Sequence, residues 1–215
     1  MEGTKPGVCR ADRRRLVLSL SLGAWLPFAG TSARAGAQIE EPIADAVRSA
    51  MSAAVADLAP PRPSFTNIED RLRYLAWLGA MSDRLKGRQK DTPTRIDFLE
   101  ALWYESKRAG LEPALILGLI QVESGFRKYA ISVAGARGFM QVMPFWARLI
   151  GDGEVGHLFH MQTNLRFGCA ILRHYLNVEK GDLFLALGRY NGSRGRREYP
   201  DAVLGAKRQW DFQPR

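Results

Sequence analysis

The sequence predicts a mainly α-helical protein, and three observations lead to this fold class. Apolar residues recur at helical spacing in one segment after another, for instance at Leu99, Leu102 and Trp103. Proline stands where the first turn of a helix tolerates it, as at Pro113. No stretch shows the alternating β-branched pattern of a half-buried strand, so we expect at most a short β-hairpin.

The first 35 residues predict a cleaved export signal. Four arginines between positions 10 and 15 precede an uncharged run from Leu16 to Gly30, and the small-residue segment Ala33-Arg34-Ala35 follows. The run falls short of the ~20 residues that a membrane-spanning helix needs. We therefore expect removal of residues 1–35 and a periplasmic protein. Arg13-Arg14 loosely resembles a twin-arginine signal, so export by Sec or by Tat stays open.

Residues 36–65 predict an N-terminal helix followed by a stiff linker. Between Pro42 and Leu58 the apolar residues share one helical face: Ile43, Val47, Met51, Ala54 and Leu58. Ala59-Pro60-Pro61-Arg62-Pro63 cannot continue a helix. The helix would dock on the rest of the chain or self-associate, and it could contact a cell-envelope or secretion machinery partner.

Residues 66–215 are predicted to form the main helical domain. Thr66-Asn67-Ile68-Glu69 has the spacing of a capping box, which opens a helix with leucines toward the core at positions 72, 75, 78 and 85. Polar residues from Lys86 to Asp91 end it. The further helices expected are 92–110, 113–123, 144–150, 163–177 and 182–189, with a loop over 126–138.

The net charge limits the classes of partner that we expect, and the cysteine content limits the disulfides that can form. Without residues 1–35 the chain has 25 Lys and Arg against 20 Asp and Glu, and the whole excess follows Leu165. This basic third suits an anionic polymer such as a cell wall with free carboxylates, although ordinary surface charge would give the same pattern. Nucleic acid is not an expected partner, because no aromatic and basic residues are interleaved. Cys169 is the only cysteine after residue 35, so the mature chain cannot form an internal disulfide. We expect Cys169 to be a buried packing residue.

Glu123 is the candidate catalytic residue. It ends the apolar run from Pro113, and a helix that ends there directs its negative dipole end at the carboxylate. Apolar neighbours would remove water from it, and both effects raise the pKa toward the range of a general acid. The alternative is a solvated glutamate on a fraying helix end.

Two further motifs follow Glu123-Ser124 in order: Gly138-Phe139-Met140-Gln141 and Tyr190-Asn191. Together the three motifs resemble the lytic transglycosylase family with a soluble lytic transglycosylase (SLT) catalytic domain, from about Thr94 to Trp210. The resemblance implies a lysozyme-like arrangement of helices around a substrate cleft. Phe139 replaces the usual Leu, and Arg189 replaces the usual Ala before Tyr190-Asn191.

The resemblance also implies a reaction on peptidoglycan glycan strands. Glu123 would protonate the oxygen between N-acetylmuramic acid and N-acetylglucosamine, and the acetamido group of the substrate would stabilise C1. The Glu123 carboxylate would then deprotonate the 6-hydroxyl, which gives a 1,6-anhydromuramoyl end without consuming water. No second acid lies in the motifs, and loop solvation or helix capping explains Asp152, Glu154 and Asp182 equally well.

Five residues are predicted to bind the substrate: Ser124, Met140, Gln141, Tyr190 and Asn191. Gln141 could hold an N-acetyl group through its amide, with Met140 as an adaptable apolar wall. Each of the polar residues alone could equally be a satisfied buried side chain. Their order along the chain favours a common site.

No cofactor or metal is expected. His157 and His160 fit no zinc signature, and no glycine loop suits a phosphate. Two rival functions stay open: a muramidase that admits water to the same intermediate, and a non-catalytic wall-binding component of a secretion apparatus.

Overall fold

The structure is a computed structural model that describes Met1, Gly3, Gln38 and residues 40–56 and 63–213. Ser32–Arg215 form one compact unit, separate from Met1–Thr31, and the described helices all belong to it. The predicted export signal, Leu58 and most of the proline-rich linker lie outside the described residues.

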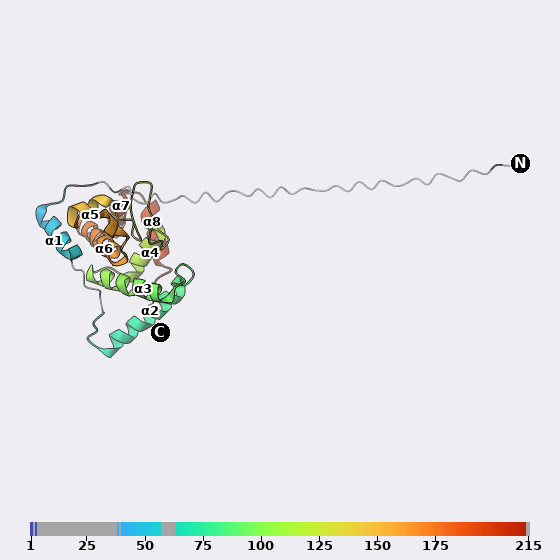
Figure 1. Cartoon of the computed structure of the whole chain (residues 1–215), viewed down its shortest axis with the longest axis horizontal. Helices are drawn as coiled ribbons and strands as arrows, with labels where there is room; N and C mark the ends of the chain where they lie inside the picture. The colour runs from blue at the N-terminus through green and yellow to red at the C-terminus, as the bar shows by residue number, and fades with distance from the viewer. Residues whose placement is uncertain (2, 4–37, 39, 57–62, 214–215) are drawn as a thin grey trace. The chain divides into compact units, whose positions relative to one another are not determined.

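The described residues are mainly α-helical, which confirms the predicted fold class (Figure 1). The helices are α1 (Asp45–Ala56), α2 (Ile68–Leu85), α3 (Thr92–Arg108), α4 (Pro113–Glu123), α5 (Pro144–Ile150), the 3-10 helix η1 (Val155–Phe159), α6 (Met161–Val178), α7 (Leu183–Asn191) and α8 (Glu198–Lys207). Between α4 and α5, isolated antiparallel bridges join Arg137 to Ile131 and to Val142, which agrees with a short hairpin at most. Among these helices none is long and apolar enough to cross a bilayer.

Helix α4 lies in the core and carries Glu123 at its end. Its residues from Leu115 to Ile120 are all buried, as a helix that is apolar all round requires. Gly118 faces α8, and a Cβ there would lie 2.6 Å from the backbone nitrogen of Lys207. The missing side chain therefore lets the backbones of α4 and α8 approach closely.

Helix α2 corrects two predictions about its residues. Asn67, not Thr66, is the N-cap, and its side chain accepts a hydrogen bond of 2.8 Å from the backbone nitrogen of Asp70. Leu78 and Leu85 are buried as predicted, but Leu72 and Leu75 are 57% and 48% exposed. The buried face of the helix instead follows the aromatic and sulfur-containing side chains Tyr74, Trp77 and Met81.

Helix α1 packs on the body of the protein. Met51 and Val55 are buried, and the helix contacts α5 and α6. It begins three residues after the predicted start at Pro42, and Val47 of the predicted apolar face is exposed. The domain boundaries at residues 35 and 65 stay predictions.

Helix α8 and the short helix η1 were missed from the sequence. The segment before α8 is rich in Gly and Arg and resembles a loop, which concealed the apolar spacing that follows it. That spacing, Tyr199, Val203, Ala206 and Trp210, is helical, and all four side chains are buried. Pro200 stands in the first turn, where a helix tolerates proline.

Candidate active site

Glu123 is the last residue of α4, and its side chain is enclosed by the protein. Only 8% of the residue is exposed, and burial raises the pKa of its carboxyl to about 8, in part opposed by a hydrogen bond from Tyr199. The raised pKa is the direction expected from its place in the sequence. At neutral pH the acid is therefore protonated in most molecules.

The backbone turns sharply after Glu123. Gly125 and Phe126 both have left-handed conformations, with φ of 59° and 67°. For a bulky residue such as Phe126 this conformation is strained, and such strain is found at functional sites. The Phe126 ring is buried between Phe98 and Trp210, at centroid distances of 6.1 and 5.3 Å. Aromatic packing thus fixes the turn that ends α4.

Tyr199 is the polar partner of Glu123. Its hydroxyl donates a hydrogen bond of 2.5 Å to Oε1 of Glu123. The pKa of Tyr199 is raised well above its ordinary value, first by burial and then by the charge of the Glu123 carboxylate. Tyr199 therefore acts as a donor at neutral pH. The other oxygen of Glu123, Oε2, is buried, and none of the described residues forms a hydrogen bond with it.

The predicted motif Gly138-Phe139-Met140-Gln141 forms a tight loop fastened to α6. Gly138 has a φ of 77°, and a Cβ there would lie 2.4 Å from the side chain of Asn164. Asn164 is fully buried and accepts a hydrogen bond of 2.8 Å from the backbone nitrogen of Met140. Its amide donates to the carbonyls of Arg137 and Leu158, each at 2.8 Å. Asn164 thus fixes the loop, a role that no local pattern in the sequence indicates.

Met140 and Gln141 are held inside the protein. Met140 is fully buried, and a Cβ at Gly168 would lie 2.3 Å from its sulfur, so its side chain packs closely against α6. Gln141 is buried with a φ of 50°, and its Nε2 donates to the carbonyls of Ala130 and Gly138 at 3.1 and 2.9 Å. Both amide protons of Gln141 are thus used within the loop.

Tyr190 and Asn191 lie at the end of α7, next to this loop. The hydroxyl of Tyr190 donates a hydrogen bond of 2.8 Å to the carbonyl of Met140. Burial and then the charge of Glu123 raise the pKa of Tyr190 well above its ordinary value, so the phenol lies within electrostatic reach of the acid. Asn191 is also buried. The fold therefore brings the second and third motifs together, and the third near Glu123.

Ser124 is buried, and its hydroxyl donates to the carbonyl of Ile120 at 3.2 Å. This contact is one that a satisfied buried side chain makes, which is the alternative stated for each polar residue of the motifs. The substrate-binding roles of Ser124 and the other four predicted residues stay predictions, as does the cleft.

The other candidate acids have local roles. Asp182 caps α7 by accepting from the backbone nitrogen of Leu185 at 3.0 Å, as one alternative predicted. Asp152 accepts from the backbone nitrogen of Glu154 and pairs with His157 at 2.7 Å. Within the described residues no group of three His, Cys, Asp or Glu side chains could hold a metal ion. Cys169 is buried, as its neighbours in the sequence predicted.

Comparison with known proteins gives a consistent result. Residues 101–211 match the family described as Transglycosylase SLT domain. The chain is 37% identical over 90 residues to membrane-bound lytic murein transglycosylase C of Actinobacillus pleuropneumoniae serotype 5b (strain L20), which covers 39% of this chain and 22% of that protein. It is 30% identical over 116 residues to a transglycosylase of Enterobacteria phage PRD1, with 51% of this chain and 42% of the phage protein covered.

Among solved structures, the chain is similar to an inactive mutant of the lytic transglycosylase Slt from Pseudomonas aeruginosa, at 25% identity and a TM-score of 0.41. That similarity covers 65% of this chain and 27% of the other. The chain thus spans about a fifth to two fifths of the length of the curated relatives described above. Because the family match covers residues 101–211, just over half of the sequence and the part that holds all three motifs, the chain belongs to the SLT transglycosylase domain family.

Proposed function

We propose that this protein is a peptidoglycan lytic transglycosylase, a lyase that cleaves the β-1,4 bond between N-acetylmuramic acid and N-acetylglucosamine, with Glu123 as its only acid and base. Membership of the SLT family and the names of the relatives support the class of reaction. The geometry around Glu123 supports the mechanism.

The observation that carries the proposal is the unequal environment of the two Glu123 oxygens. Oε1 accepts a hydrogen bond from the hydroxyl of Tyr199, whereas Oε2 is buried and has no hydrogen-bond partner in the part of the chain that the structure describes. Since the pKa of Glu123 is about 8, the acid keeps a proton at neutral pH, and Oε2 is the oxygen free to carry it. A proton held there is available to an incoming glycosidic oxygen.

The reaction balances with this single acid. Glu123 donates its proton to the bridging oxygen as the bond from that oxygen to C1 of the muramic acid breaks. The substrate's acetamido group stabilises C1, and Glu123, now a carboxylate, takes the proton of the 6-hydroxyl as O6 bonds to C1. The acid is regenerated, and the products are a 1,6-anhydromuramoyl end and a free 4-hydroxyl.

The surroundings of Glu123 favour this route over hydrolysis. Among the described residues, burial and the Tyr199 hydroxyl account for the shifted pKa of Glu123, with no contribution from a second carboxylate. An inverting hydrolase needs such a second carboxylate to activate water. The 6-hydroxyl belongs to the bound sugar, so its proximity gives it an advantage over bulk water.

The loop 138–141 and the end of α7 are the proposed walls of the substrate site. Both amide protons of Gln141 are engaged with loop carbonyls, so we propose that Gln141 shapes the loop and presents its carbonyl oxygen to the glycan. Tyr190 supports the same loop through the carbonyl of Met140. Ser124 and Asn191 complete the proposed set.

The proposed setting is the cell envelope. Some relatives are named membrane-bound lytic murein transglycosylases, which is consistent with a location in the cell envelope. We propose that this chain is exported and that residues 1–35 are removed. We propose peptidoglycan strands as the partner, with α1 as the surface for any envelope or secretion machinery partner. No cofactor is needed for the proposed steps.

The experiment is an assay of the purified chain, residues 36–215, on isolated peptidoglycan. We expect release of soluble muropeptides, and E123Q serves as the matched inactive control. Binding to peptidoglycan without any release would favour a non-catalytic wall-binding protein.

A further inference from the structure

A side chain from before α1 satisfies two buried polar groups near the candidate site. The buried indole of Trp146 donates a hydrogen bond of 2.8 Å to Oε1 of Gln38. The Nε2 of Gln38 donates to the carbonyl of Tyr190. That carbonyl lies in the last turn of α7, where helix carbonyls have no partner within the helix. Gln38 thus joins α5 to the end of α7.

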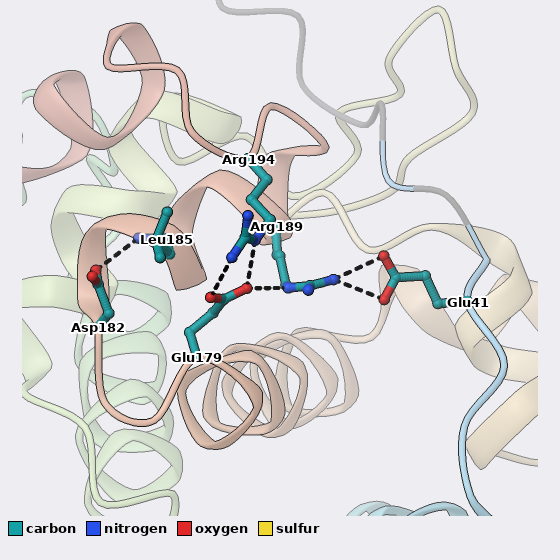
Figure 2. Close-up of polar contacts among 6 residues, drawn as sticks. All are labelled: Glu41, Glu179, Asp182, Leu185, Arg189 and Arg194. Atoms are coloured by element: carbon teal, nitrogen blue, oxygen red, sulfur yellow. Dashed lines mark hydrogen bonds and ion pairs between the residues drawn. The ribbon is translucent and has the colours of Figure 1, made fainter.

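A second contact holds the same segment. Both carboxylate oxygens of Glu41 accept from Nη1 of Arg189, each at 2.9 Å (Figure 2). The Nε of Arg189 pairs with Glu179, which Arg194 contacts from its other side (Figure 2). The arginine that departs from the family pattern therefore lies between two carboxylates, and its charge is compensated.

We propose that Gln38 and Glu41 form an N-terminal strap that positions Tyr190, which makes Gln38 a positioning residue for the proposed reaction. The inference rests on the proposed function. The strap holds the carbonyl of Tyr190, and the hydroxyl of Tyr190 holds the carbonyl of Met140 in the loop 138–141. Strap, α7 and loop thus form a continuous series of hydrogen bonds.

The strap has two anchors of different strength. Gln38 is buried, and its removal would leave the indole nitrogen of Trp146 and the carbonyl of Tyr190 without partners in a place with little water. The side chain of Glu41 is 55% exposed, so its ion pair with Arg189 is screened by salt and contributes less. Gln38 is therefore the residue to change.

Two substitutions in the chain 36–215 separate the two bonds of Gln38. Gln38→Ala removes both bonds. Gln38→Glu keeps an acceptor for Trp146 and, at a pH high enough to ionise the new carboxyl, has no donor for the carbonyl of Tyr190. Arg73→Ala is the matched control, because it removes surface ion pairs with Glu69 and Asp70 in α2.

Three quantities are measured on the same samples: kcat and KM on peptidoglycan, the pH above which kcat falls, and hydrogen exchange of the Gly192 and Ser193 amides that close the end of α7. We expect Gln38→Glu, which loses one hydrogen bond, to lower kcat about tenfold. Gln38→Ala, which loses both, should lower kcat at least as much. We also expect the fall in kcat to begin at lower pH, because a loosened Tyr190, whose phenol lies within electrostatic reach of Glu123, would let water reach the acid and lower its pKa. Exchange at the two amides should rise in both variants, and Arg73→Ala should match the wild type in all three measurements.

An unchanged kcat and pH profile in Gln38→Ala would overturn the proposal, even with a lower melting temperature, since Gln38 would then only pack. Wild-type kcat in Gln38→Glu across the pH range, including the alkaline side where the new carboxyl is ionised, would also overturn it, because the bond to Tyr190 would be dispensable. If the wild type itself cleaves nothing, the proposed function fails, and the exchange data alone decide whether the strap holds α7. Unchanged exchange at both amides would then exclude the strap.

Discussion

The hydroxyl of Tyr199 donates a hydrogen bond of 2.5 Å to Oε1 of Glu123, across 76 positions of the sequence. The pair joins the end of α4 to the first turn of α8, and the close approach of these helices at Gly118 makes the contact geometrically possible. Tyr199 orients the carboxyl group and leaves Oε2 free. The proposed chemistry depends on this division between the two oxygens.

Replacement of Glu123 by Gln should abolish cleavage. The amide keeps the shape of the side chain but has no acidic proton, and general acid catalysis typically contributes ~10²- to 10⁴-fold. Turnover on purified peptidoglycan, together with a pull-down on the same material, measures cleavage and binding separately. We expect binding to persist, and residual turnover within a few-fold of the wild type would remove Glu123 from the mechanism.

Tyr199→Phe should slow the reaction and move its alkaline limit to higher pH. In the wild type, the hydrogen bond from Tyr199 lowers the pKa of Glu123. Without this bond the pKa of Glu123 rises further, and the acid becomes a weaker proton donor. We expect kcat to fall about tenfold, the effect of roughly 1.4 kcal/mol. The measurement is the pH dependence of kcat.

Tyr74→Phe is the matched control for that substitution. This substitution also removes a tyrosine hydroxyl that donates to a glutamate, here to Oε1 of Glu100 at 3.4 Å. The pair joins α2 to α3 and does not involve Glu123. The pH profile of Tyr74→Phe should equal that of the wild type. An equal shift in both variants would mean that the effect does not act through Glu123.

Stability should fall with pH because of Glu123. Its ordinary pKa is 4.5 and its pKa in the folded protein is about 8. Below pH 4.5 the carboxyl of Glu123 is protonated in both the folded and the unfolded state, so folding does not bury a charge and the free energy of unfolding is at its highest with respect to this group. Between these values only the folded state holds the proton, and the free energy of unfolding declines by about 1.4 kcal/mol per pH unit until the folded pKa is passed.

E123Q lacks this titration and should become more stable than the wild type as the pH rises. Urea denaturation of both proteins at pH 5 and pH 8 measures the difference in unfolding free energy. A difference that stays constant between these pH values would show that Glu123 titrates normally.

Gln141→Ala should destabilise the loop as well as reduce turnover. The substitution removes the hydrogen bonds to the carbonyls of Ala130 and Gly138, each worth about 1 kcal/mol, and places Ala at a positive φ. Thermal denaturation and turnover per folded molecule check the two effects. Gln141→Asn tolerates the positive φ and isolates the loss of the hydrogen bonds. An unchanged melting temperature in both variants would return Gln141 to a role with substrate alone.

The sequence predicted the helices whose signals are local. Apolar periodicity, Pro113 and the polar residues before α2 and α7 lie within one or two turns of the helices that they mark, and these helices appear within a few residues of the expected bounds. The cap of α2 itself is one residue later than predicted, at Asn67. The prediction that Leu72 and Leu75 are buried is wrong. It rests on the apolar character of leucine alone, whereas Tyr74, Trp77 and Met81 determine which face of α2 is buried.

The candidate site was only partly predictable, because its key contacts are distant in sequence. Glu123 could be proposed from its place at the end of an apolar helix together with the two motifs that follow it. Tyr199, Asn164 and Gln38, in contrast, reach their partners only through the tertiary fold. A signal for Tyr199 existed in its apolar spacing with Val203 and Ala206. That pattern predicts a helix, and no pattern predicts which carboxylate its tyrosine contacts.

Analysis of the reaction product tests the central claim most directly. The purified chain 36–215 is incubated with isolated peptidoglycan, with E123Q as the blank and a muramidase digest as the reference, and the soluble muropeptides are weighed by mass spectrometry. Because the 6-hydroxyl replaces water as the nucleophile, we expect muropeptides lighter by one water than the reference, without new reducing ends. Muropeptides with reducing muramic acid ends as the main product would contradict the account, since water would then reach the intermediate and the protein would be a hydrolase.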